Sequence, residues 1–165
     1  MKIIALILFF LAGLNEDIPH SWEKACLKEV KKTFDIENVT INRQTLDIDG
    51  HGRPSPGIVL YYLLDGEDQI GYAVLTSAKG RHDYFDYIVI YDADLTILRV
   101  RVFEYRSDYG YEICNKKWLS QFEGSKGCNL KYETDIDAIS GATYSASSIT
   151  EDLSYLCYYL TKNLK

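Results

Sequence analysis

The chain has 165 residues, of which 47% are hydrophobic, and its formal net charge is −6. This length suits one domain with a single core and leaves no room for a second domain. No cluster of Lys or Arg follows one face, so the sequence argues against a nucleic acid partner.

The first element, residues 1–13, resembles a signal segment. Lys2 precedes an apolar run over residues 3–11 that is too short to cross a bilayer comfortably. We therefore predict export to the periplasm or to the outer face of the cytoplasmic membrane. The segment is either cleaved or kept as an uncleaved anchor, and residues 14–165 form the single domain.

A helix and a series of strands are expected next. Apolar residues recur every three or four positions in residues 18–34, which predicts a helix. A strand is expected over residues 39–46, followed by a glycine- and proline-containing loop over residues 47–57. Two apolar runs, residues 58–64 and 70–76, flank an acidic turn and predict a hairpin.

Two more strands are predicted in the middle of the chain, over residues 84–91 and 95–105. In the second of them Arg99 and Arg101 alternate with apolar residues, which places both arginines on one face. Short turns between successive strands favour an antiparallel sheet.

Helices are expected to follow the strands, over residues 112–122 and 147–163, and the latter keeps one apolar stripe. The predicted fold is therefore α+β: an antiparallel sheet of about four to six strands packed with N-terminal, middle and C-terminal helices.

The chain has four cysteines, whose pairing depends on the cellular compartment of the protein. In an exported chain an even number favours disulfides, and four cysteines allow three connectivities. We predict that Cys114 pairs with Cys128 and Cys26 with Cys157. Buried free thiols are the alternative. The absence of a Cys-x-x-Cys spacing argues against a zinc ribbon or a thioredoxin-type pair.

The most distinctive motif is Asp-Ala-Ile-Ser-Gly-Ala-Thr at residues 137–143, just before the C-terminal helix pattern. Gly141 allows the backbone to approach a ligand closely, and the start of a helix offers unpaired N–H groups and a positive dipole end. This combination predicts an anion site. An ordinary turn is the alternative, because residues 148–151 fit a capping box without any ligand.

The motif resembles the flavin-attachment sequence of the FMN-binding domain family, which includes the flavin-carrying subunits of sodium-pumping NADH:quinone oxidoreductase and of Rnf complexes. In that family a flavin transferase uses FAD and magnesium to attach FMN to the last Thr through a phosphoester. The resemblance implies FMN on Thr143, with Asp137 orienting the loop for the transferase. It also implies phosphate contacts from Ser140, Gly141 and Ala142.

Three upstream segments extend the resemblance to approximately residues 71–160. These are a glycine-aromatic strand entry at 71–73, a glycine turn at 109–113, and a short helix with a closing Phe-x-Gly at 118–124. The sequence departs from the family at residues 107–110, where Ser-Asp-Tyr-Gly stands in place of the Thr-Pro-Gly-x-Gly of many members.

Aromatic residues beside the matched segments are candidates to contact the flavin ring, because flat side chains suit the faces of a flat cofactor. The candidates are Tyr109, Trp118 and Tyr144, and Gly110 belongs to the same turn as the first of them.

Other chemistries find little support. The three histidines, at positions 20, 51 and 82, have no metal-ligand spacing. Ser140 lacks a Gly-x-Ser-x-Gly context, which argues against a hydrolase. The acidic clusters lack the twelve-residue calcium loop and are interpreted as solvated turns.

The expected function is that of an exported electron carrier with covalent FMN, modified by a flavin transferase and serving redox proteins of the cell envelope. Its negative charge favours a positively charged partner. Two alternatives remain: a flavin-free exported module that binds a protein or small ligand, and a flavin-dependent enzyme with a substrate pocket beside the ring.

Overall fold

The computed structural model describes residues 20–45 and 57–164. The predicted signal segment and the predicted loop over residues 47–57, apart from Gly57, lie outside these described residues.

The described residues form one antiparallel sheet in the order β1-β2-β3-β4-β5, in which each strand pairs with the next along the chain. This five-stranded meander confirms the predicted α+β fold. The strands are β1 (Val39–Thr45), β2 (Val59–Asp65), β3 (Asp68–Lys79), β4 (Tyr84–Asp92) and β5 (Ile97–Tyr105).

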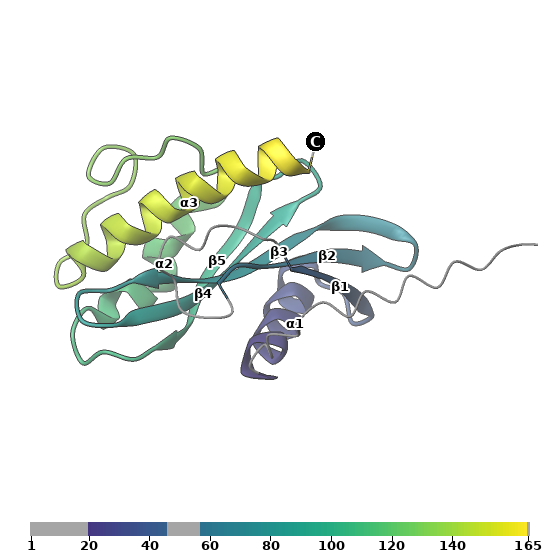
Figure 1. Ribbon diagram of the computed structural model, residues 1–165, viewed down its shortest axis with the longest axis horizontal. Coiled ribbons are helices and arrows are strands. Elements are labelled where there is room, and N and C mark those ends of the chain that lie inside the picture. Colours follow the sequence, from purple (N-terminus) through teal and green to yellow (C-terminus); the bar gives the residue numbers. More distant parts are fainter. Residues whose placement is uncertain (1–19, 46–56, 165) are drawn as a thin grey trace, which may run out of the picture.

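Helices cover both faces of the sheet (Figure 1). Helix α1 (His20–Phe34) packs on one face, and helix α3 (Thr143–Asn163) lies across the other. The central strands are therefore buried on both sides: all eight residues from Gly71 to Ala78 of β3 are buried. Continuous burial of this kind, instead of alternation, is what a doubly covered strand requires.

Each face has its own apolar core. The core under α3 is the larger of the two, and the short helices that follow β5 also contribute residues to it. The face under α1 packs Trp22, Cys26 and Val30 against alternate residues of β2, β3 and β4. Arg99 and Arg101 lie opposite Ile90 and Ile88 of this second core, which confirms that the two arginines share a face.

The prediction of one continuous helix over residues 112–122 is wrong. The chain instead forms three short pieces: η1 (Tyr111–Cys114), α2 (Lys116–Leu119) and η2 (Ser120–Phe122). The break falls at Asn115, whose backbone is extended and whose side chain accepts hydrogen bonds from the N–H groups of Lys117 and Trp118, at 2.9 and 3.1 Å. Asparagine ends one turn and caps the next because its amide oxygen competes for backbone donors.

The C-terminal helix begins four residues earlier than predicted, at Thr143 in place of Ser147. The capping-box sequence at residues 148–151 therefore lies inside α3 and does not start it. Thr143 is therefore the first residue of the helix.

The predicted disulfides are wrong. Cys128 pairs with Cys157, with Cα atoms 5.2 Å apart, while Cys26 and Cys114 are free. Cys26 lies on α1 and Cys157 on α3, so the sheet separates them. Burial raises the pKa of the Cys26 thiol to about 12, with a smaller contribution from Glu23, and raises the pKa of Cys114 to about 11.

The loop after η2 explains the observed pairing. Ser154 on α3 donates a hydrogen bond to the carbonyl of Gly127 at 3.2 Å and accepts one from the N–H of Leu130 at 3.1 Å. These contacts hold the loop along α3 and bring Cys128 beside Cys157. Within the same described ranges, no helix is long and apolar enough to span a bilayer.

Candidate functional site

The start of α3 is an open helix end. Its N-cap residue, Ala142, makes no side-chain capping bond, and the first backbone bond of the helix runs from the N–H of Ala146 to the carbonyl of Ala142 at 2.9 Å. Within the described part of the chain, the N–H groups of Thr143, Tyr144 and Ser145 have no partner. Three free donors at the positive end of a 21-residue helix suit an anion.

A cavity of about 560 Å³ opens at this helix end. Three distant parts of the chain line it: the β3–β4 turn, the turn after β5, and the loop that leads into α3. The lining residues are Arg81, Tyr109, Gly110, Gly141, Ala142, Thr143, Tyr144 and Ser145.

Glycines let these three segments approach one another. Gly110 and Gly141 have positive φ values of 86° and 89°, which favour glycine. A Cβ at Gly110 would lie 2.6 Å from the hydroxyl oxygen of Tyr105, and one at Gly141 would lie 2.8 Å from Oε1 of Glu112. The turns therefore need glycine both for their backbone conformation and for space.

Two tyrosines form an exposed rim around the cavity. Tyr109 is 69% exposed and Tyr144 is 51% exposed. The carbonyl of Tyr109 accepts a hydrogen bond from the Tyr105 hydroxyl at 2.5 Å, and its ring lies 5.6 Å from the His82 ring. These contacts hold the backbone and the ring of Tyr109, while most of the residue stays exposed at the cavity.

The structure brings together six of the predicted site residues and separates three. Trp118 is only 7% exposed and donates its ring N–H to the carbonyl of Asp137 at 2.8 Å. Both residues line a smaller neighbouring hollow, and the N–H of Asp137 donates to Gln121 Oε1 at 2.9 Å. Ser140 is exposed on the loop but does not line the Thr143 cavity. The hydrogen bonds from Trp118 and to Gln121 therefore hold the motif loop at Asp137.

Two lining residues, Arg81 and Ser145, were not singled out from the sequence. Ser145 is buried, and a Cβ at either Gly80 or Gly110 would lie 3.5 Å from its hydroxyl oxygen, so it sits where the two turns meet α3. The only sequence signal for either residue is local: Arg81 follows Gly80 in a predicted turn, and Ser145 follows the motif by two positions.

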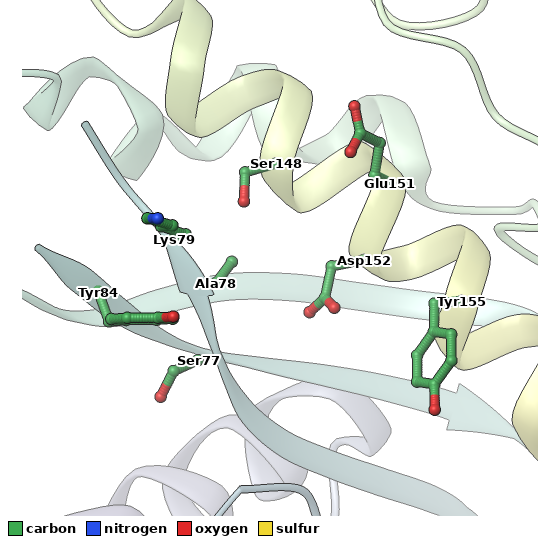
Figure 2. A pocket seen from close by; sticks show the side chains of 8 residues that line it. All are labelled: Ser77, Ala78, Lys79, Tyr84, Ser148, Glu151, Asp152 and Tyr155. Atoms are coloured by element: carbon green, nitrogen blue, oxygen red, sulfur yellow. The ribbon is translucent and has the colours of Figure 1, made fainter. Parts of the chain in front are cut away.

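A second hollow of about 340 Å³ lies further along α3, between this helix and the ends of β3 and β4. Figure 2 shows Ser148 and Asp152 projecting from α3 toward the strand that carries Ser77 and Ala78. The other lining residues are Lys79, Tyr84, Glu151 and Tyr155. The Asp152 carboxylate accepts a hydrogen bond from the Tyr87 hydroxyl. With two carboxylates in its lining, this hollow is less suited to a phosphate than the cavity at the helix end.

Across residues 20–45 and 57–164, no group of three or more His, Cys, Asp or Glu side chains is arranged to hold a metal ion. The chemistry of the Thr143 cavity therefore rests on backbone donors, hydroxyls, aromatic rings and one guanidinium.

Comparison with protein families identifies the domain. The family model of the FMN-binding domain matches residues 80–155, and a search of curated proteins found no match. The matched segment contains every residue that lines the Thr143 cavity. The cavity also fits the cofactor, since free N–H groups and glycine turns suit its phosphate and exposed tyrosines suit its ring. Residues 80–155 are thus an FMN-binding domain, and this chain is a flavoprotein whose cofactor is FMN.

Proposed function

We propose that FMN is attached covalently to Thr143 through a phosphoester. The observation that carries this proposal is the position of Thr143. It is the first residue of α3, it is exposed, and its hydroxyl makes no hydrogen bond within the described part of the chain. It lies beside the free N–H groups that would receive the phosphate.

The attachment is a phosphoryl transfer from FAD. The Thr143 oxygen bonds to the phosphorus of the FMN half, the phosphoanhydride bond breaks, AMP leaves, and the hydroxyl proton passes to a base. The transferase supplies that base and the magnesium ion. Ser140 and Asp137 are exposed, and within the described residues the Asp137 carboxylate has no hydrogen-bond partner, so it is available to orient the loop against the transferase.

We further propose that the protein is an exported electron carrier. FMN supplies the redox chemistry, while the chain sets its position and exposure. Tyr109 and Tyr144 line a cavity that is open to solvent, so a ring held there can meet the cofactor of another protein. The net charge of −6 favours positively charged redox proteins of the cell envelope as partners.

Of the alternatives, a flavin-free binding module is not retained, because FMN is the cofactor of this domain. A flavin-dependent enzyme would bind a small substrate beside the ring, in an oriented and water-poor pocket. The open rim of exposed tyrosines favours the carrier over that enzyme.

The attachment is tested by producing the protein together with a flavin transferase. Intact mass should show one FMN, and peptide mapping should place it on the peptide that contains Thr143. Thr143→Ala should abolish in-gel flavin fluorescence, whereas Thr143→Ser should retain part of it because the hydroxyl remains. Thr134→Ala removes an exposed threonine from the turn just upstream and should be labelled normally. Fluorescence that persists in Thr143→Ala would refute the assignment.

A further inference from the structure

We infer that Arg81 forms the ion pair with the FMN phosphate and positions it at the start of α3. Arg81 comes from the β3–β4 turn, far in sequence from the attachment motif. The inference rests on the proposed function, because it places the phosphate beside Thr143.

Arg81 is the one cationic side chain among the residues that line the Thr143 cavity. It makes no ion pair within the described part of the chain. Arg99 and Arg101 approach the Glu123 carboxylate at 4.0 and 3.7 Å, and Arg106 pairs with Asp86 at 2.5 Å. Arg81 is thus an exposed guanidinium at the cavity without a protein partner, and guanidinium is the side chain best suited to a phosphate.

The turn that carries Arg81 has a defined position. The N–H of Gly80 donates to the carbonyl of Asp83 at 2.8 Å, and the Asp83 side chain accepts from the N–H of Tyr84 at 2.7 Å. Next to Arg81, the His82 ring lies against Tyr109 on the cavity rim. These contacts fix the turn on both sides of Arg81.

A negative charge beside Gly141, outside the lining of the cavity, reinforces this placement. The Glu112 carboxylate lies so close to Gly141 that a Cβ there would be 2.8 Å from Oε1 and 3.0 Å from Oε2. This carboxylate repels a phosphate, whereas Arg81 and the free N–H groups of Thr143 and Tyr144 attract it. The phosphate therefore belongs in the cavity near Arg81 and these N–H groups, away from Glu112.

Lys79 provides a matched control. It is exposed, carries the same charge and lies only two residues away. However, Lys79 lines the second hollow and not the Thr143 cavity (Figure 2). Lys79→Gln and Arg81→Gln change the net charge equally, so any difference between them reports the position of the charge.

The experiment titrates unloaded wild-type protein and its variants with FMN and with riboflavin, which lacks the phosphate, and follows flavin fluorescence. Arg81→Gln should weaken FMN binding about tenfold, as expected for loss of a charge-assisted hydrogen bond, and leave riboflavin binding unchanged. Arg81→Lys should recover part of the loss, and Lys79→Gln should behave like the wild type. Added salt should weaken FMN binding more in the wild type than in Arg81→Gln.

Equal losses of FMN affinity in Arg81→Gln and Lys79→Gln would overturn the inference, and so would equal losses of FMN and riboflavin in Arg81→Gln. If FMN binds too weakly to titrate, the ³¹P resonance of covalently loaded protein replaces the titration. It should shift in Arg81→Gln and not in Lys79→Gln, and an unmoved resonance overturns the inference. The titrations do not use the Thr143 hydroxyl, so a flavin mapped to another residue would refute the covalent attachment separately.

Discussion

At the scale of single residues, Gly141 is the position where local conformation and site geometry depend on each other most closely. Its φ of 89° lies in the left-handed region, and the space where a side chain would point holds the Glu112 carboxylate. This conformation turns the chain into α3, whose first three residues line the cavity. An L-residue here incurs a backbone penalty and must also move Glu112.

Gly141→Ala should therefore lower the free energy of unfolding by about 1–2 kcal/mol and slow the attachment of FMN. Gly124→Ala is the control, because Gly124 has a similar φ of 82° but no atom lies within 4 Å of the place that a Cβ would occupy there. Thermal unfolding should show a loss in both variants, at least as large in Gly141→Ala, where Glu112 must also move, as in Gly124→Ala. Only Gly141→Ala should reduce the initial rate of flavin incorporation, and equal incorporation rates in the two variants would contradict the role assigned to this turn.

At the scale of elements, α3 has two separate tasks. Its first turn lines the cavity in which we propose that FMN is attached, and its middle is tied to the loop after η2 by Ser154 and by the disulfide between Cys128 and Cys157. Cys157 is 14 residues beyond Thr143, which corresponds to about 21 Å along a helix axis. Stability and cofactor attachment should therefore be separable along this helix.

The variant Cys128→Ser/Cys157→Ser should lose about 3.6 kcal/mol of stability, given the 29-residue separation of the two cysteines, and should retain normal FMN loading. Denaturant unfolding and in-gel fluorescence measure the two effects.

In oxidised wild-type protein, thiol counting under denaturing, non-reducing conditions should find two free thiols, from Cys26 and Cys114. A count of none would support the fully paired arrangement that the even number of cysteines suggested. A count of four would exclude the observed disulfide.

At the scale of the whole molecule, the sheet is a support that is covered on both faces, with the site at one end of α3. On the α1 side, Arg101 connects distant segments, since it approaches Glu29 of α1 at 3.9 Å and Glu123 of the loop after η2 at 3.7 Å. Burial lowers the pKa of Arg101, as does Arg99 nearby, while Glu123 and Glu29 raise it. The α1 side is thus linked by ion pairs, whereas the Thr143 cavity is lined by the turns around the start of α3.

We expect an electron carrier with this net charge to associate with its partner proteins through electrostatic attraction. Stopped-flow mixing of the reduced protein with positively charged redox proteins should give fast reoxidation that slows as ionic strength rises, because salt screens the attraction. A negatively charged redox protein of similar potential is the control and should react slowly at low salt. Inertness toward redox proteins, combined with saturable turnover of a small metabolite, would favour the enzyme instead.

The sequence determined the strands, helices and motif that depend on local patterns of residues. Alternating or continuous apolar runs separated by glycine- and aspartate-containing turns were sufficient to predict the antiparallel sheet, and the recurrence of apolar residues was sufficient for α1 and most of α3. The backbone chemistry of the contiguous motif at residues 137–143 pointed to an anion, and its resemblance to a known family pointed to FMN. Helix ends were less accurate. The side chain of Asn115 caps α2 and divides the segment that was predicted as one helix, and α3 begins at Thr143 without any side-chain cap.

Tertiary structure alone decided which distant segments meet. Arg81 reaches the Thr143 cavity because the β3–β4 turn and the start of α3 lie at the same end of the sheet, and no local pattern encodes that proximity. Cys157 pairs with Cys128, and not with Cys26, because the sheet lies between α1 and α3. Local propensity acts over a few neighbouring residues, whereas these contacts depend on the order of the strands and on the face that each helix covers.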